Sequence, residues 1–201
     1  GLNSAQREVV GSDVGPLLVL AGPGSGKTRV ITRRIAFLVE GRYVDPGNIA
    51  AMTFTNKAAR EMEERLLGNP ESDIEPPLLK HWREYRNRFT CGTFHSFCAK
   101  VLRQHGRHVG LEHGFSIFDE EDQIRLIKLA MADSSIDPEQ YSPRSIIGRI
   151  SRAKSQGIDH RKFERESEGY FEEIVARVYS RYQDLMALNN SADFDDLLFK
   201  T

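Results

Sequence analysis

Residues 17–28, LLVLAGPGSGKT, decide the fold that the sequence predicts. The apolar run 17–21 is short and continuous, which is typical of a strand buried on both faces of a parallel sheet. A glycine-rich turn follows and leads directly into Lys27 and Thr28. Apolar residues then recur at helical spacing over 30–39. A strand, a glycine loop, Lys-Thr and a helix in this order predict a phosphate-binding loop.

The residue types in this loop suit a nucleoside triphosphate. Glycines let several backbone N–H groups approach phosphate oxygens closely, and the start of the next helix adds a partial positive charge. We expect Lys27 to reach the β- and γ-phosphates and the Thr28 hydroxyl to ligate Mg²⁺, so both carry the catalytic role. Ala21 replaces the first glycine of the strict pattern, which is the mildest departure. The loop residues expected to hold the nucleotide are Gly22, Gly24, Ser25, Gly26, Lys27 and Thr28.

Composition bounds the class of protein. A chain of 201 residues with 39% hydrophobic content can build one large domain or two small ones. Cys91 and Cys98 lack the pattern of a disulfide framework or a zinc site, so we expect buried, reduced thiols. The sequence contains no apolar run of membrane-spanning length and no visible secretory signal. We therefore expect a soluble cytoplasmic protein without a membrane partner.

Charge is balanced overall but segregated along the chain. The formal net charge is −1, which by itself neither favours nor excludes a nucleic-acid partner. Residues 80–107 hold seven Lys or Arg against Glu84 alone, and 141–165 again hold seven against Asp159 and Glu164. Such runs are usually solvated helix faces, so charge alone is weak evidence for DNA.

Two further apolar runs, 49–54 and 89–94, read as buried strands, each followed by a helix. The first helix is expected over 57–67, ending at Gly68, and Ser96 is expected to cap the second. Ligands of open α/β sheets bind at the carboxyl ends of parallel strands, where Phe54 lies. An aromatic side chain there suits stacking on a base, although a core position is the simpler interpretation. A catalytic pair of His95 and Cys98 is disfavoured, because no third orienting group is evident.

The chain begins with a predicted helix over 2–8, capped by Asn3 or Ser4. Gln6 is either an exposed helix residue or a reader of adenine, whose N6 and N7 match a carboxamide. Residues 69–77 are expected to form a loop and 78–88 a basic helical stretch.

Strand–helix alternation ends around 106–114, and only helices are expected from 120 to 188. Asp119 is expected to cap the first of them. A new helix begins near Asp193. Its neighbours Asp195 and Asp196 suggest a metal site, but carboxylates in a first turn are more often favoured by the helix dipole. This half reads as a helical domain inserted into the α/β domain.

Four stretches together carry a resemblance to a known family. LNSAQREVV, AGPGSGKT, AMTFTNKAAREMEERL and GTFHSFCAKVLR resemble the Q motif and motifs I, Ia and Ib of UvrD/Rep/PcrA-type superfamily 1A DNA helicases. IFDEEDQIRLIK and SPRSIIGRISRAKSQG resemble the inserted helical subdomain 1B, and DFDDLL resembles the return to subdomain 1A. The resemblance covers essentially the whole chain.

The resemblance implies a RecA-like α/β fold in which a parallel sheet is flanked by helices and interrupted by an all-helical subdomain. It implies subdomain 1A over 1–110, subdomain 1B over 111–190 and a return to 1A over 191–201. It implies ATP and Mg²⁺ as cofactors, with Gln6 reading adenine and Arg29 lying along the base. The residues implied to line a single-strand DNA channel are Thr53, Phe54, Thr55, Asn56, Thr93 and His95. The basic helix around Arg149, Arg152 and Lys154 is implied to approach duplex DNA.

The family moves 3′ to 5′ along single-stranded DNA by closing a cleft between two RecA-like domains around ATP. Its acidic Walker B motif follows DFDDLL, and its second RecA-like domain supplies an arginine finger; we find neither in residues 1–201. The sequence therefore predicts the N-terminal part of a helicase that does not turn over ATP alone. Two alternatives remain open: the N-terminal part of a helicase–nuclease subunit, or a nucleotide-dependent DNA-binding module that never hydrolyses ATP.

Overall fold

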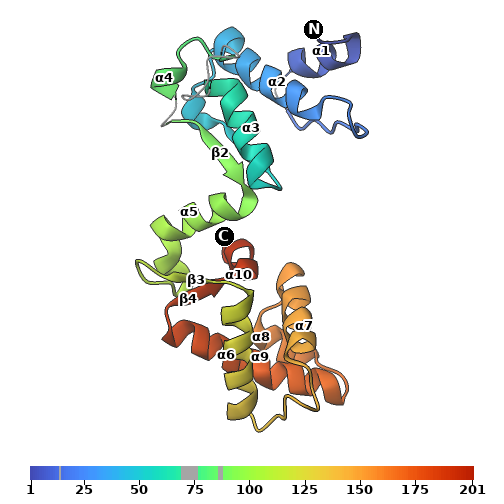
Figure 1. The fold of residues 1–201 in the computed structure, drawn as a ribbon, viewed down its shortest axis with the longest axis vertical. Helices are drawn as coiled ribbons and strands as arrows, with labels where there is room; N and C mark the ends of the chain where they lie inside the picture. The colour runs from blue at the N-terminus through green and yellow to red at the C-terminus, as the bar shows by residue number, and fades with distance from the viewer. Residues whose placement is uncertain (14, 69–76, 86–87) are drawn as a thin grey trace. The chain divides into compact units, whose positions relative to one another are not determined.

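The computed structural model describes residues 1–13, 15–68, 77–85 and 88–201 (Figure 1). The chain divides into two compact units, 1–94 and 95–201, and each is described by itself. The expected loop over 69–77 lies almost wholly outside the described residues, and the basic stretch 78–88 lies partly outside them.

The first unit mixes helices with a short parallel sheet. Its elements in order are α1 (Ser4–Gly11), α2 (Lys27–Arg42), a 3-10 turn (Pro46–Asn48), β1 (Ala50–Thr53), α3 (Asn56–Leu67), α4 (Trp82–Tyr85) and β2 (Thr90–Thr93). Strands β1 and β2 pair in parallel, with Ala50 opposite Thr90 and Thr53 opposite Thr93. Helix α3 packs against both strands. The two predicted strands are confirmed, each slightly shorter than its apolar run.

Local signals explain where these helices begin and end. Asn3 caps α1 in a capping box with Gln6, as the sequence predicts. The Thr55 hydroxyl accepts from the backbone N–H of Ala58 and so caps α3, which ends before Gly68. Helix α2 is joined to α1 by Arg34, whose guanidinium donates to the backbone carbonyls of Val9 and Ser12.

The predicted strand before the glycine loop is absent from the structure. Residues 17–20 have no regular secondary structure, and Leu18 and Leu20 are 83% and 88% exposed. The physical reason is the lack of a partner: within the described residues β1 pairs with β2 alone, and no strand hydrogen-bonds to 17–20. A strand is buried on both faces only when neighbouring strands and helices cover it. The core of this unit lies instead between α2, α3 and the segments around Leu79 and Phe89.

The second unit is mainly helical. Its elements in order are α5 (Phe94–His105, whose first residue belongs to the first unit), a 3-10 turn (Gly106–Val109), β3 (Ser116–Phe118), α6 (Glu120–Asp133), α7 (Pro143–Ser155), α8 (His160–Glu166), α9 (Tyr170–Leu188), β4 (Ser191–Asp193) and α10 (Phe194–Phe199). The expectation of helices alone over 120–188 is confirmed, as is Asp119 as the cap of α6. The parallel pairing of β3 with β4 was not predicted.

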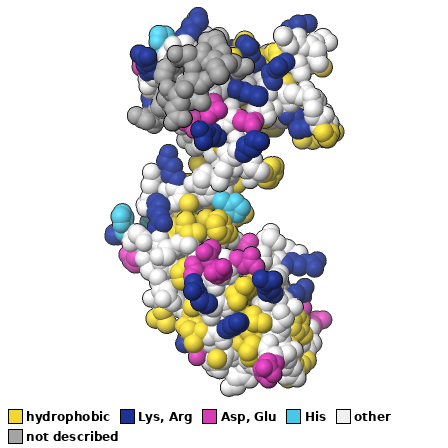
Figure 2. Space-filling model, in the orientation of Figure 1, with side chains coloured by type: hydrophobic (Ala, Val, Ile, Leu, Met, Phe, Trp, Pro, Cys, Tyr) yellow, Lys and Arg dark blue, Asp and Glu magenta, His cyan; other side chains and the backbone are white. Residues whose placement is uncertain are grey.

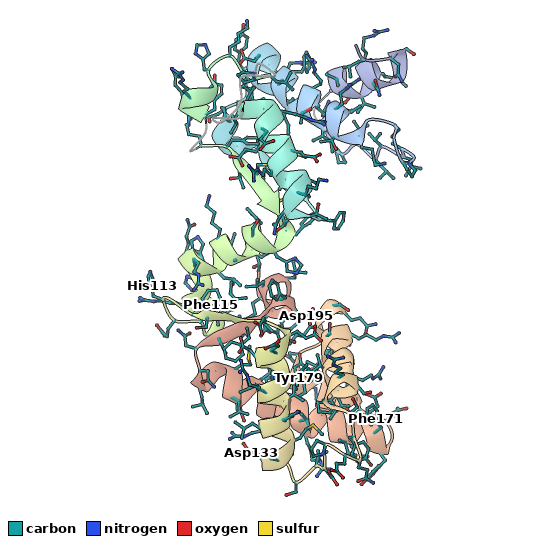
Figure 3. All side chains as sticks on the ribbon, viewed as in Figure 1. His113, Phe115, Asp133, Phe171, Tyr179 and Asp195 are labelled. Carbon is teal, nitrogen blue, oxygen red and sulfur yellow. The ribbon has the colours of Figure 1, made fainter. Side chains whose placement is uncertain are left out.

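The apolar stripes read from the sequence form the core of this unit. Helices α6, α7 and α9 bury residues such as Ile127, Ile146 and Val178 completely. Tyr179, labelled in Figure 3, is buried in this bundle, and its hydroxyl donates to the carbonyl of Ile158 at 3.2 Å. No described helix is long and apolar enough to cross a membrane.

Helix α5 differs from its prediction in two ways. It begins at Phe94, so Ser96 lies inside the first turn and does not cap it. Its buried face, Cys98 and Leu102, shares a core cluster with Phe115, Ala192 and Leu197. Because of this cluster α5 belongs to the same compact unit as the helices after it, and the two compact units divide after residue 94. The subdomain limits at 110 and 190 stay a prediction.

Candidate functional site

The glycine loop has a backbone suited to an anion. Gly24 and Gly26 have φ of 73° and 82°, left-handed values that other residues rarely adopt. Gly26 is also the residue before α2, and a Cβ there would lie 3.2 Å from the Gln6 side chain. Within the described residues the N–H groups of Lys27 and Thr28 have no hydrogen-bond acceptor, as expected in a first helical turn. These donors and the helix dipole make the start of α2 a site for negative charge.

Lys27 points back into the loop. Its ammonium group donates to the carbonyl of Ala21 at 3.1 Å and to that of Gly22 at 2.8 Å. The Ser25 hydroxyl donates to the same Gly22 carbonyl at 2.7 Å. The lysine is exposed, and its acceptors within the described part of the chain are neutral carbonyls, so an incoming phosphate offers it a stronger, charged partner.

Gln6 connects α1 to the glycine loop. Its side-chain oxygen accepts from the backbone N–H of Asn3 at 3.0 Å, which completes the capping box. Its side-chain nitrogen donates to the Ser25 carbonyl at 3.0 Å. Gln6 therefore lies beside the loop, as an adenine reader must, but both ends of its carboxamide already have partners. Arg29, one turn into α2, is exposed.

The ends of β1 and β2 present aromatic side chains. Phe54 is 92% exposed, which excludes the core position that its apolar run suggests. Its ring centroid lies 5.5 Å from that of Phe94, which is 43% exposed and follows β2 as Phe54 follows β1. Phe94 is absent from the predicted site residues, although the repeated Thr-Phe after both strands signals it.

The threonines at these strand ends are buried. Thr53 is buried, and its hydroxyl donates to the Thr55 carbonyl at 3.0 Å and more weakly to that of Gly92 at 3.4 Å. Thr93 is also buried and lies opposite Thr53 in the sheet. Asn56 is exposed at the first position of α3. The first unit thus brings together five of the six predicted DNA residues.

His95, the sixth, belongs to the second unit. There its ring lies 5.8 Å from that of Phe194 in an edge-to-face arrangement. Phe194 is 49% exposed and was not predicted. The sequence pattern gave no reason to single out Phe194, because the segment that begins at Asp193 was interpreted as the start of a helix.

The interpretation of Lys154 as a DNA-facing residue is wrong. Lys154 is 3% exposed, and its ammonium group lies 2.6 Å from Asp193 Oδ2 and 2.9 Å from Asp196 Oδ1. Tyr182 donates its hydroxyl to the same Asp193 oxygen at 2.9 Å. Lys154 therefore neutralises two buried carboxylates.

The neighbours of Lys154 differ from it. On the same helix α7, Arg149 is half-buried and paired with Glu172, whereas Arg152 is exposed. Figure 2 shows basic side chains on the visible face of this unit. Of these three residues of α7, Arg152 alone is exposed.

The acidic run at α10 is a helix cap and not a metal site. Asp193 accepts from the backbone N–H of Asp196 at 2.7 Å, and the Asp196 side chain accepts in return from Asp193. Asp195, labelled in Figure 3, lies in the first turn. No group of three or more His, Cys, Asp or Glu among the described residues could hold a metal.

The buried charges shift one another's pKa. Burial alone would lower the pKa of Lys154, but the charges of Asp196 and Asp193 outweigh it and the pKa is raised. Burial raises the pKa of Asp196 by more than the Lys154 charge lowers it. Burial and the Asp193 charge raise the pKa of Tyr182 far above its ordinary range. Lys154 and Tyr182 therefore keep their protons at neutral pH.

A glycine loop with left-handed φ at Gly24 and Gly26, leading directly into the first turn of α2, is the local arrangement typical of phosphate-binding proteins. The sequence model of the UvrD/REP helicase N-terminal domain matches residues 2–201. The chain belongs to this family.

Curated relatives agree with that assignment. The chain is 44% identical over 201 residues to the ATP-dependent DNA helicase PcrA of Bacillus subtilis strain 168, covering all of this chain and 26% of the relative. It is 42% identical over 201 residues to PcrA of Leuconostoc citreum, with 100% and 25% covered. It is 41% identical over 203 residues to PcrA of Staphylococcus aureus strain Mu50, with 100% and 26% covered. The chain spans about a quarter of the length of these relatives.

Proposed function

We propose that this chain forms the ATP-binding and single-strand-binding N-terminal part of a DNA helicase. In this proposal ATP hydrolysis by the whole protein drives movement 3′ to 5′ along single-stranded DNA and unwinds duplex at a junction. The observation that carries the proposal is the left-handed glycine loop opening onto α2, with Lys27 exposed inside it. Membership of the UvrD/REP family supports the same conclusion.

The residues of the loop fit the triphosphate of ATP. Gly22 and Gly24 have open space where a Cβ would stand, so phosphate oxygens can approach the backbone there. Lys27 would exchange its two carbonyl acceptors for phosphate oxygens, and the Thr28 hydroxyl would ligate Mg²⁺. We propose that Mg²⁺ arrives bound to the phosphates, whose oxygens are the ligands that it prefers. Bound ATP supplies the phosphoryl group whose transfer drives movement.

Gln6 and Arg29 would hold the base. To pair with adenine, the Gln6 carboxamide would give up both of its present contacts. Its nitrogen would leave the Ser25 carbonyl, and its oxygen would leave the backbone N–H of Asn3. Arg29 would lie against the base face, because a guanidinium stacks on aromatic planes. Helix α1 would then sense the nucleotide through one side chain.

The exposed aromatic pair is the proposed contact with single-stranded DNA. Bases stack on aromatic faces regardless of sequence, which suits a protein that moves along DNA. Phe54 provides the more exposed face and Phe94 supports it from the neighbouring strand end. Asn56 and Thr55 would bind phosphate or sugar beside them, Thr53 and Thr93 would hold the strand ends in register, and His95 would extend the channel.

We propose the subdomain limits given above, 1–110 and 191–201 for 1A and 111–190 for 1B. A second RecA-like domain of the whole protein would close the cleft around ATP. Without the acidic residue that orients the attacking water, this chain should bind Mg·ATP and not hydrolyse it. Binding and hydrolysis of Mg·ATP therefore test different features. Binding tests the glycine loop, and hydrolysis tests whether all the catalytic residues are present.

The test of the nucleotide site is Mg·ATP binding to the 201-residue chain and to Lys27→Ala, measured by calorimetry. Loss of the charge-assisted contact should weaken binding about tenfold or more. Lys128→Ala, which removes an exposed lysine of the second unit, is the matched control and should bind as the original chain does. Equal affinity of Lys27→Ala and the control would overturn the assignment of the loop.

The test of the DNA site is binding of a fluorescent oligo-dT by Phe54→Ala. Removing one stacking platform should cost about 1–3 kcal/mol of binding free energy. Tyr43→Ala removes another exposed aromatic of the same unit and should leave affinity unchanged. If salt and Phe54→Ala both leave binding unaltered, the strand ends do not contact DNA.

A further inference from the structure

A second concave site lies beside α2, on a face that the phosphate-binding loop does not use. It is a cavity of about 890 Å³ lined by Arg7 of α1, Arg29, Thr32 and Arg33 of α2, Arg65 of α3 and the segment 77–78. Arg29, Thr32 and Arg33 are spaced i, i+3 and i+4, so they share one face of the helix. No glycine of the loop lines this cavity, and neither does Lys27.

The lining is strongly cationic. Four guanidinium groups line the cavity, and none of the lining residues that the structure describes is acidic. In the part of the chain that the structure describes, none of the four forms an ion pair. Arg7 donates to the Leu2 carbonyl at 2.8 Å, which leaves its charge uncompensated. Four like charges around one space repel one another, and an anion bound among them removes that repulsion.

Size and chemistry define the class of ligand. The cavity falls within the range of small-molecule sites, about 300–1,000 Å³, and is far larger than one phosphate requires. Guanidinium groups form paired, charge-assisted hydrogen bonds with phosphate oxygens. The Thr32 hydroxyl is already used, since it donates to the carbonyls of Thr28 and Arg29, so the arginines carry recognition.

We propose that this cavity binds a small anion carrying two or more phosphate groups, separately from ATP at the glycine loop. Arg33 and Arg65 approach from different helices and hold the ligand between α2 and α3. Arg29 is shared with the proposed base contact, so occupation of the cavity restrains a residue of the nucleotide site. The site should bind its ligand whether or not ATP is bound, because its other arginines do not belong to the glycine loop.

The experiment uses inorganic tripolyphosphate as the probe and calorimetry on the 201-residue chain. Lys27→Ala serves as the background, since it weakens the competing phosphate site. In that background tripolyphosphate should still bind, and adding Arg33→Ala and Arg65→Ala should reduce the affinity about tenfold or more. Adding Arg161→Ala, an exposed arginine of the second unit, should change nothing. Unchanged denaturation midpoints establish that the variants fold.

Several outcomes overturn the proposal. Loss of tripolyphosphate binding in Lys27→Ala alone would mean that the loop takes all of it, which leaves the proposed function intact. If tripolyphosphate no longer bound to the original chain once ATP was saturating, the cavity would be part of the nucleotide site. If the arginine variants weaken oligo-dT but not tripolyphosphate, the ligand is a DNA backbone. A different result would separate the two proposals. If ATP affinity did not depend on Lys27 while the arginine variants still weakened tripolyphosphate binding, the proposed function would be wrong and the anion site would stand.

Discussion

Each of the two units places certain side chains where hydropathy alone would not, and the two differ in which kind of side chain is displaced. In the first unit apolar side chains are exposed: Leu18, Leu20 and Phe54 are each more than 80% accessible. In the second unit a lysine, Lys154, is buried with Asp193 and its neighbour Asp196. The first unit therefore exposes apolar side chains to solvent, and the second pairs charged side chains in its interior. Exposure follows from which partners a segment finds, and hydropathy alone does not determine it.

The largest expected effect, and the most direct way to break this comparison, is Lys154→Ala. The substitution leaves two carboxylates buried without their cation, so the free energy of unfolding of the second unit should fall by about 3–5 kcal/mol. Chemical denaturation followed by helical circular dichroism measures it. Arg152→Ala, two residues away on the exposed side of α7, should change stability by less than about 0.5 kcal/mol. Similar losses in both variants would mean that the buried cluster contributes nothing specific.

Helices and caps were predictable because their signals are local. The apolar spacing of Ile146, Ile150 and Val178 identifies their helices and their buried faces together. Asp119 and Asp193 cap helices through contacts to the third residue beyond each. No distant residue is needed for either inference, so the sequence suffices.

Strand pairing and buried charges were not predictable in the same way. Residues 17–20 have the composition of a central strand, yet a strand forms only beside another one. Lys154 sits in a basic run and reads as solvated, but its partners lie 39 residues or more along the chain. Phe54 lies in an apolar run that suggests a core position, but its side chain is exposed. In all three cases the answer depends on contacts that sequence spacing does not contain.

The second expected effect concerns Cys91, whose sulfur lies 3.5 Å from the Ala59 carbonyl. Burial, and to a smaller extent the Glu63 charge, raises the pKa of its thiol to about 11. A raised pKa means less thiolate at neutral pH, so alkylation at pH 8 should be about 100-fold slower than for an ordinary thiol. The rate should keep rising up to about pH 11.

The measurement uses Cys98→Ser, so that Cys91 is the single thiol, and follows iodoacetamide labelling by mass. Glu63→Gln removes the smaller cause and should speed labelling modestly. A labelling rate that levels off near pH 8.5 would mean that the Cys91 thiol has an ordinary pKa. The thiol would then not be shielded from solvent in the first unit.

A smaller effect is expected at Tyr43, which follows α2 with φ of 56° and is 88% exposed. Left-handed backbone costs a non-glycine residue about 1 kcal/mol, and this side chain offers little packing in return. Tyr43→Gly should therefore stabilise the first unit by about 0.5 kcal/mol, after the added freedom of glycine in the unfolded chain. Tyr43→Ala keeps the strain and should give no gain. Thermal unfolding of the three chains compares them.

The smallest expected effect is the sharpest test of the first unit. Leu20→Lys places a charge where the structure is 88% exposed, so the free energy of unfolding should change by less than about 0.5 kcal/mol. Leu66→Lys, at a position with no exposed surface, should cost about 3 kcal/mol or more, because the charge loses its water. If the two variants destabilise the chain equally, residues 17–20 are buried as their composition first suggests. The contrast between the two units would then reduce to the buried charges of the second.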